Sequence, residues 1–354
     1  MKWVLVSDLH FKTSDWMASI EEYTGLFFPR ENLYKCVDLV KEYGCNGILV
    51  LGDVFDRPLN SHFLVHNVIS IFEDIASRVP NIVILLGNHD IAKTKMYNVD
   101  DETTPYTTLL GLKRENIHVV TSVEYLDNNI ILVPYTERHL LVENRENWEG
   151  TTVITHIGVS GLEIKTGVTI PDEFSFEVLS SYHKVLTGHY HKPQSKGNIT
   201  VVGSPWAVRN DELFDEKYVW LWDVENDTLT PIPSITPRVV PLEVNSLKQM
   251  ADLERFIKDK LSSSGEQVFV KFLITVSDSK LLPHLQKLSQ KFKGHIIANY
   301  KRKNIDKEVM KTKSIGIDSE GAITMEQLLS DFLTPEEWTV LTELGLTKET
   351  LFRN

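Results

Sequence analysis

Hydrophobic residues fall into short continuous runs that alternate, over the first part of the chain, with stretches of helical periodicity. The apolar runs cover residues 3–7, 47–51 and 82–86, and the helical patterns between them cover 31–43 and 61–78. Apolar runs joined through helices are typical of parallel strands that are buried on both faces. The sequence therefore predicts a βαβαβ unit at the start of an α/β domain.

Later apolar runs are accompanied by short helical patterns or by none. They cover residues 130–134, 153–156, 185–188, 199–203 and 218–224. Strands that are not separated by long helices favour a second sheet packed face to face with the first. We therefore expect an α/β (α+β) fold in which two sheets form a sandwich.

Prolines 231, 233, 237 and 241 interrupt this pattern and indicate a domain boundary. Beyond them, three strand patterns alternate with two helical ones between residues 239 and 300, which predicts a small βαβαβ domain. Two short amphipathic helices are expected at 325–332 and 335–344; they either dock on the small domain or bind a partner. The predicted domains are 1–235, 236–304 and 305–354.

Composition narrows the class of protein. The 354 residues contain two cysteines and carry a net charge of −12, and no apolar run is long enough to span a membrane. These features predict a soluble cytoplasmic protein with reduced, buried thiols, and they argue against nucleic-acid binding over the whole surface. Positive charge is concentrated in 291–313, which has eight Lys or Arg and two acidic residues and includes Lys301, Arg302 and Lys303. This segment is either a solvated helix end or linker, or a contact for the phosphate backbone of a nucleic acid.

Five short stretches carry metal-ligand side chains, each directly after an apolar run. They are Asp8-Leu9-His10, Gly52-Asp53, Gly87-Asn88-His89-Asp90, Thr155-His156 and Gly188-His189-Tyr190-His191. Carboxylate, imidazole and amide groups suit a pair of divalent cations such as Mn²⁺ or Mg²⁺, whereas a structural zinc site would recruit thiolates. Any one stretch is weak evidence, but the five together predict a two-metal phosphoesterase.

The order of the stretches suggests how two ions would be shared. Asp53 is expected to bridge them, because its loop lies between the other ligand loops. Asp8 and His10, two residues apart, can reach one ion. The other ion would take the Asn88 amide oxygen and the imidazoles of His156 and His189.

His89 is expected to have a catalytic role instead. It follows Asn88 directly, so its side chain should point away from the metals and toward the scissile phosphate, where an imidazolium can protonate the leaving oxygen. Asp90 is expected to hold the His89 ring in one tautomer.

With these residues placed, the chain resembles the calcineurin-like metallophosphoesterase superfamily, whose fold is a double β-sandwich flanked by helices. The motifs Ser7–His10, Gly52–Asp56, Gly87–Asp90 and Gly188–His191, followed by Gly203-Ser204-Pro205, are similar to those of SbcD-type nuclease subunits of double-strand-break repair complexes, including bacteriophage versions. That family also has a small cap domain and C-terminal helices.

The resemblance implies a ligand set and an activity. One ion would be held by Asp8, His10, Asp53 and His191, and the other by Asp53, Asn88, His156 and His189. Asp56 would support a ligand or position substrate.

An SbcD-type protein is an Mn²⁺-dependent DNA nuclease of repair and recombination, acting as a 3′→5′ exonuclease on duplex ends and an endonuclease on single strands. Its C-terminal helices bind an SbcC-type, SMC-like ABC ATPase. Such proteins form homodimers, and in this chain the helix at 31–43 or at 61–78 would form the interface. The resemblance also implies a location in the cytoplasm of a bacterium or of a phage-infected bacterium.

Two alternatives remain open from the sequence. A phosphodiesterase for small molecules or cyclic nucleotides, or a protein phosphatase, would keep the metal site, although protein phosphatases of this superfamily typically have Glu where this chain has Asp90. A scaffold that has lost catalysis should have lost ligands, and all the expected ligands are present here.

Overall fold

The structure is a computed structural model of the chain. It describes residues 1–13, 25–92, 107–165, 168–169, 174–209, 212, 214–236, 238–263, 270–292 and 296–300. All the elements that follow belong to the unit Met1–Lys301.

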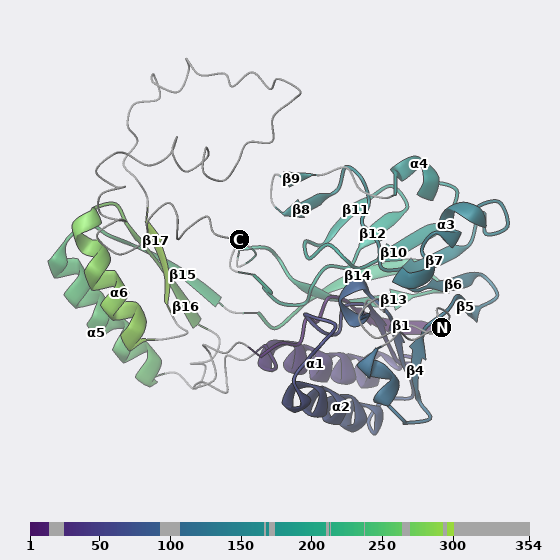
Figure 1. Cartoon of the computed structure of the whole chain (residues 1–354), viewed down its shortest axis with the longest axis horizontal. Coiled ribbons are helices and arrows are strands. Elements are labelled where there is room, and N and C mark those ends of the chain that lie inside the picture. Colours follow the sequence, from purple (N-terminus) through teal and green to yellow (C-terminus); the bar gives the residue numbers. More distant parts are fainter. Residues whose placement is uncertain are drawn as a thin grey trace, which may run out of the picture. The chain divides into compact units, whose positions relative to one another are not determined.

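The first sheet has the strand order β14-β13-β1-β2-β3-β4 (Figure 1). Strands β1 to β4 are parallel, β13 is antiparallel to β1, and β14 is antiparallel to β13. Their bounds are β1 Lys2–Val6, β2 Ile48–Leu51, β3 Ile82–Leu85, β4 Ile117–Val120, β13 Tyr218–Asp223 and β14 Thr228–Pro233. Helices α1 (Phe27–Tyr43) and α2 (His62–Ala76) connect the first three strands, as the sequence predicts.

The second sheet has the order β11-β12-β10-β7-β6-β5. Its strands are β5 Glu124–Asp127, β6 Ile130–Val133, β7 Thr152–Thr155, β10 Lys184–Thr187, β11 Gln194–Lys196 and β12 Ile199–Val201. Short helices α3 (Leu140–Glu143) and α4 (Phe176–Leu179) and the hairpin of β8 (Glu163–Lys165) and β9 (Val168–Thr169) accompany it.

Alternate residues of the strands build three cores in a helix–sheet–sheet–helix sandwich. In β1, Val4 and Val6 face the core with α1 and α2, whereas Trp3 and Leu5 face a core that also contains Leu186 of the second sheet. The outer face of the second sheet packs with α3 and α4. The α/β sandwich predicted from the sequence is confirmed.

One strand was assigned to the wrong sheet. The run 218–224 was expected in the second sheet, but β13 pairs with β1, with Lys2 opposite Asp223. Its side chains alternate like those of β1, because Val219 faces the helix side and Trp222 faces the core between the sheets. Since both faces of both sheets are apolar, hydrophobicity alone did not select the sheet.

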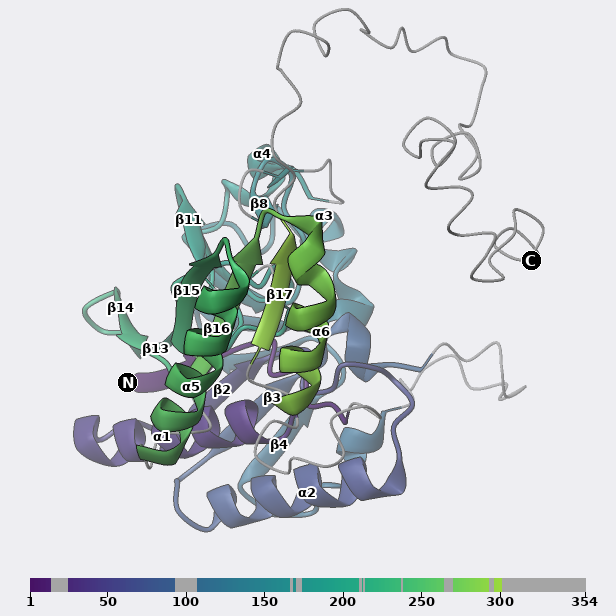
Figure 2. The same cartoon turned by 90° about the vertical axis from the view of Figure 1, so that its left-hand side faces the viewer.

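The predicted small βαβαβ module is present. Strands β15 (Arg238–Val244), β16 (Val270–Val276) and β17 (Ile296–Tyr300) form a parallel sheet, with helices α5 (Leu247–Ser263) and α6 (Leu282–Lys291) in the crossovers. Figure 2 shows both helices on one face of this sheet. The module has its own core, in which Ile257 and Leu285 pack on Phe272. Its predicted limits, 236–304, stay a prediction.

Several expectations lie outside the described residues. Lys301, Arg302, Lys303 and the two C-terminal helices at 325–332 and 335–344 are among them.

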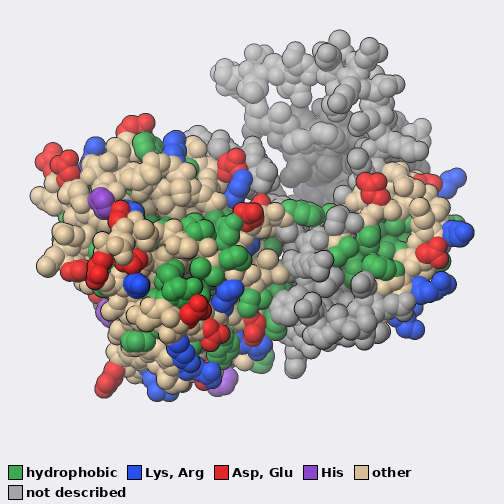
Figure 3. All heavy atoms as spheres, turned by 180° about the vertical axis from the view of Figure 1, so that it is seen from behind, with side chains coloured by type: hydrophobic (Ala, Val, Ile, Leu, Met, Phe, Trp, Pro, Cys, Tyr) green, Lys and Arg blue, Asp and Glu red, His purple; other side chains and the backbone are tan. Residues whose placement is uncertain are grey.

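Within the part of the chain that the structure describes, no helix is long and apolar enough to cross a membrane. On the face shown in Figure 3, acidic and basic side chains are interspersed among hydrophobic ones, with no broad basic area, in keeping with the net charge of −12.

Candidate metal centre

The predicted ligands meet at the carboxyl ends of strands from both sheets. Asp8 and His10 follow β1, Asp53 follows β2, and Asn88 follows β3 in the first sheet; His156 follows β7, and His189 and His191 follow β10 in the second. Because neighbouring parallel strands end at the same edge of a sheet, residues distant in the sequence converge there.

The backbone at this edge is held in unusual conformations. Five described residues other than glycine have positive φ, and four of them are Asp8 (51°), His10 (45°), Asp53 (52°) and His189 (81°). Such conformations cost on the order of 1–3 kcal/mol each and cluster at functional sites. Their concentration here indicates that the fold is built to aim these side chains.

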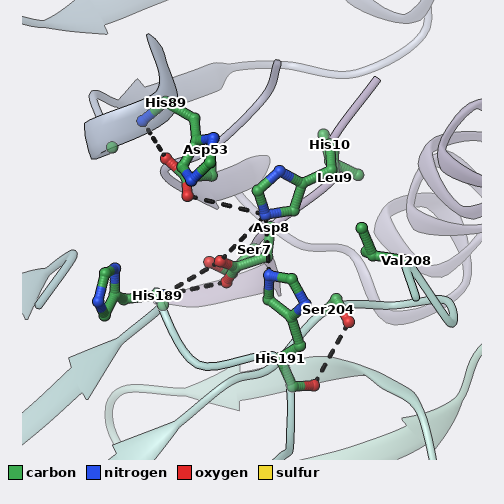
Figure 4. A network of polar contacts seen from close by, with 12 residues as sticks. Ser7, Asp8, Leu9, His10, Asp53, His89, His189, His191, Ser204 and Val208 are labelled. Carbon is green, nitrogen blue, oxygen red and sulfur yellow. Dashed lines mark hydrogen bonds and ion pairs between the residues drawn. The ribbon is translucent and has the colours of Figure 1, made fainter. Parts of the chain in front are cut away.

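One group of donors consists of Asp8, His10 and His191 (Figure 4). His10 Nε2 lies 3.0 Å from His191 Nε2 and 3.8 Å from Asp8 Oδ1. The Asp8 carboxylate also accepts the backbone N–H of His189 at 3.2 Å, which ties the first sheet to the second. All three predicted ligands therefore face one point.

Asp53 lies between this group and a second one. Its Oδ2 atom is 3.7 Å from His10 Nε2 and 3.2 Å from His156 Nε2. His189 Nδ1 is 3.0 Å from Asn88 Oδ1, and the His156 and His189 rings are edge to face with centroids 5.4 Å apart. This is the position that a bridging carboxylate requires.

The donor geometry fits divalent cations. The His156 ring donates from Nδ1 to the Leu51 carbonyl oxygen at 2.7 Å, so in the neutral ring the lone pair is on Nε2, the buried nitrogen that faces Asp53. Two ligand atoms at right angles around an octahedral ion with bonds of about 2.1 Å are about 3.0 Å apart. Three of the spacings above are close to this size, namely His10 Nε2 to His191 Nε2 at 3.0 Å, His156 Nε2 to Asp53 Oδ2 at 3.2 Å and His189 Nδ1 to Asn88 Oδ1 at 3.0 Å. The mixture of carboxylate, imidazole and amide groups suits hard to borderline metals.

Opposite charges hold the central pair, Asp53 and His156, ionised against the effect of burial when no metal is bound. Burial opposes ionisation of Asp53, but the charges of His156 and His10 hold its pKa well below the ordinary value. Burial alone would lower the pKa of His156, yet Asp53 raises it to about 9. The ion pair marks a place where positive charge is stabilised, and a bound cation would replace the proton of His156.

His89 lies beside the metal ligands. Its backbone N–H donates to Asp53 Oδ1 at 2.9 Å, and its ring packs edge to face on His10 with centroids 5.0 Å apart. The ring nitrogen Nδ1 is 2.7 Å from the backbone oxygen of Asp56, which fixes Nδ1 as the donor and leaves Nε2 available.

The role expected for Asp90 is wrong. Its two carboxylate oxygens accept the backbone N–H groups of Phe55 and Gly87, each at 3.0 Å, so the Asp56 carbonyl and not Asp90 orients the His89 ring. Buried Asp90 instead joins the loop after β2 to the loop after β3. Asp and Asn side chains often accept nearby backbone N–H groups in turns in this way.

Asp56 itself faces His10 and two cations at the edge of the site. Its Oδ1 is 3.6 Å from His10 Nδ1 and 3.7 Å from Lys12 Nζ, and its Oδ2 is 3.9 Å from Arg57 Nε. The Lys12 and Arg57 side chains are 30% and 81% exposed. This places two accessible positive charges next to the candidate centre.

Glycines precede three of the ligand loops because nothing larger fits. A Cβ on Gly188 would lie 2.0 Å from Ser7 Oγ and 2.6 Å from the Leu51 oxygen, and one on Gly87 would lie 2.2 Å from Asp53 Oδ1. Real Cβ atoms are almost never found below 3.0 Å from another heavy atom. The Gly-Asp, Gly-Asn-His and Gly-His motifs thus reflect close packing of ligand loops.

Two residues that contact His191 were not predicted from the sequence. Glu212 Oε1 is 2.6 Å from His191 Nδ1, and Lys217 Nζ donates to the His191 backbone oxygen at 2.9 Å. Both lie in a polar connection to β13, at no spacing that a motif would reveal. The only available signal was their position shortly after Gly203-Ser204-Pro205.

The chain is similar to several known proteins. A curated relative, exonuclease subunit 1 of Enterobacteria phage T4, is 21% identical over 213 residues, which is 58% of this chain and 61% of the relative. The chain thus spans less than two thirds of that protein's length. Among solved structures, a dimetal phosphatase from Danio rerio is 9% identical with a TM-score of 0.35, covering 62% of this chain and 91% of that one.

A phosphopantetheinyl hydrolase from Mycobacterium tuberculosis is 11% identical with a TM-score of 0.30, covering 65% of this chain and 95% of that one. The model of the calcineurin-like phosphoesterase family matches residues 1–193, a range that contains all seven expected metal ligands. The chain is a metal-dependent phosphoesterase and belongs to the calcineurin-like phosphoesterase family.

Proposed function

We propose that this protein is an Mn²⁺-dependent DNA nuclease of the SbcD type. The observation that carries the proposal is the convergence of seven oxygen and nitrogen donors, with His89 beside them, in a chain similar to a phage protein named an exonuclease subunit. In this proposal Asp8, His10, Asp53 and His191 hold one ion, and Asp53, Asn88, His156 and His189 hold the other.

Two bound divalent ions about 3.5–4 Å apart would generate the nucleophile from water and neutralise the phosphate oxygens. The residues of the chain hold the metal donors in place. Asp53 spans both ligand groups, and the Asp8 carboxylate joins the two sheets through the His189 N–H, so the donors are fixed before substrate binds.

His89 holds the proton for the leaving oxygen. Its Nδ1 is occupied by the Asp56 carbonyl oxygen, so Nε2 is the nitrogen that can carry a proton to the substrate. Asp56 stays a supporting residue, close to His10 on one side and to Lys12 and Arg57 on the other. Those two cations supply local contacts for DNA phosphates on a chain whose net charge is −12.

The remaining features of an SbcD-type nuclease are part of the same proposal. They are 3′→5′ exonuclease action on duplex ends, endonuclease action on single strands, homodimerisation, and an SbcC-type ATPase partner bound through residues 305–354. Lys301, Arg302 and Lys303 would add phosphate contacts. A role in DNA repair, recombination or replication in the cytoplasm of a phage-infected bacterium follows from that partnership.

The test is degradation of linear duplex DNA, labelled at either the 3′ or the 5′ end, by the purified chain with Mn²⁺. We expect loss of DNA that stops with a chelator and falls by about 10²–10⁴-fold in His89→Ser, the usual contribution of a general acid. His139→Ser, an exposed residue that directly precedes α3, is the matched control and should retain activity.

A small chromogenic phosphodiester is assayed in parallel. Hydrolysis of this diester, with DNA intact even when the ATPase partner is added, would contradict the nuclease proposal and favour a small-molecule phosphodiesterase. Equal loss of Mn²⁺ binding and of hydrolysis in His89→Ser would contradict the catalytic role of His89.

A further inference from the structure

His191 is contacted on its outer side by a buried ion pair, Glu212 and Lys217. Glu212 Oε1 is 2.6 Å from the ring nitrogen Nδ1, and Glu212 Oε2 accepts Lys217 Nζ at 3.0 Å and the Val208 N–H at 3.1 Å. The Glu212 side chain is 7% exposed and that of Lys217 is fully buried. Glu and Lys are almost never buried to this extent unless they are paired, and removing one partner leaves an uncompensated buried charge.

The contact with Glu212 determines which nitrogen of His191 can bind metal. A carboxylate can only accept, so Nδ1 must carry the hydrogen, and the lone pair of the neutral ring is then on Nε2. Nε2 is the atom that faces the site, 3.0 Å from His10 Nε2. The hydrogen bond from Nδ1 to Glu212 therefore leaves the lone pair of Nε2 available to bind a metal ion.

Lys217 explains how a carboxylate can occupy this position. Its three ammonium hydrogens have three acceptors, namely Glu212 Oε2, the His191 backbone oxygen and Ser204 Oγ, at 2.9 to 3.0 Å. Lys217 immediately precedes β13, the neighbour of β1, whose end carries Asp8 and His10. The ion pair therefore ties His191, from the second sheet, to the strand beside its expected co-ligands.

We propose that Glu212 is a positioning residue of the metal centre, which fixes the tautomer and orientation of His191, and that Lys217 balances its charge and fixes it to β13. This inference rests on the two-metal function proposed above. It concerns the ion that Asp8, His10 and His191 would hold. The affinity for this ion should depend on Glu212 more strongly than the affinity for the ion at Asn88, His156 and His189. Partners of metal-bound histidines typically change metal affinity by about 10–100-fold.

The experiment measures Mn²⁺ binding by the full chain through the electron paramagnetic resonance signal of free Mn²⁺, with no substrate present. The variants are Glu212→Gln, which is nearly isosteric but uncharged, and Glu212→Asp, which keeps the charge. The matched control is Glu216→Gln, since Glu216 is an exposed residue whose carboxylate accepts the Tyr218 hydroxyl. Circular dichroism and thermal unfolding in chelator verify that each variant is folded.

We expect wild type and Glu216→Gln to bind two Mn²⁺ ions, Glu212→Gln to lose about 10–100-fold in affinity at one site only, and Glu212→Asp to lie between them. Nitrogen-15 spectra of the histidine rings should show a single Nδ1–H tautomer for His191 in wild type and a mixture in Glu212→Gln.

Unchanged Mn²⁺ affinity at both sites in Glu212→Gln would overturn the inference. An equal loss at both sites, with a lower unfolding temperature in chelator, would mean that Glu212 only supports the fold and would overturn it as well. Failure of the nuclease proposal has a different signature, namely wild-type protein that binds two Mn²⁺ ions and leaves DNA intact.

Discussion

Replacing Gly87 by alanine should disable the metal centre through packing alone. Gly87 has φ −95° and ψ 178°, an extended conformation that alanine adopts without strain. Its added Cβ, however, would lie 2.2 Å from Asp53 Oδ1 and 2.4 Å from the Asp53 backbone nitrogen. Ordinary contact begins at 3.4 Å, so the backbone of the expected bridging ligand must move by about 1 Å.

The magnitude follows from that displacement. Overpacking costs about 1–3 kcal/mol of stability, and a misplacement of about 1 Å in a catalytic group can reduce the rate by about 10²-fold. We therefore expect Gly87→Ala to remain folded, with Mn²⁺-dependent phosphodiester hydrolysis reduced by about 10²-fold or more.

The assay is hydrolysis of a chromogenic phosphodiester at saturating Mn²⁺, with thermal unfolding in chelator as the measure of stability. Gly111→Ala is the matched control, because its Cβ would meet only Ile69 Cδ1, at 3.4 Å. Gly87→Ala with the same activity as Gly111→Ala would refute the reasoning, because it would mean that the loops after β2 and β3 separate without affecting the site.

Three further predictions concern groups around the site and in the core. Asp90→Asn places an amide NH₂ group against a backbone N–H, so it should lower the free energy of unfolding, measured in urea titrations, by about 1–3 kcal/mol. Any reduction in the hydrolysis rate that it causes should be found again when it is introduced into the His89→Ser variant. If that reduction disappears in the double variant, the expected contact between Asp90 and His89 is restored. Burial raises the pKa of the Cys36 thiol to about 12 and also raises that of Cys45, so Ellman's reagent at pH 8 should label neither until denaturant is added; rapid labelling of the native protein would contradict their burial. Asn32→Leu removes hydrogen bonds of 2.8 Å to the N–H and C=O of Ile235, and it should cost about 1–3 kcal/mol in thermal unfolding while leaving Mn²⁺ affinity unchanged; unaltered stability would show that these backbone groups find other partners.

The expected ligands could be recognised from the sequence because each of them belongs to a short local motif. Each ligand directly follows an apolar strand, and parallel neighbours end at one edge, so local patterns and a topological rule were enough to predict that Asp8, Asp53 and Asn88 would converge. The strands that precede His156 and His191 were likewise expected in the second sheet, and the structure shows that they are neighbours there.

What the sequence did not reveal depends on contacts between distant segments. Strand β13 is apolar on both faces, so its pairing with β1 required the three-dimensional arrangement. Asp90 is next to His89 in the chain, yet its carboxylate turns to backbone N–H groups, which adjacency cannot indicate. Glu212 reaches His191 across a separation of 21 residues with no motif between them.

The central claim is that one centre, bridged by Asp53, holds two divalent ions and hydrolyses phosphodiesters. The most direct test is a crystal structure of the protein soaked in Mn²⁺, with anomalous scattering measured at the manganese edge. We predict two peaks about 3.5–4 Å apart, with Asp53 in contact with both. A single peak, or two peaks that Asp53 does not join, would contradict the account.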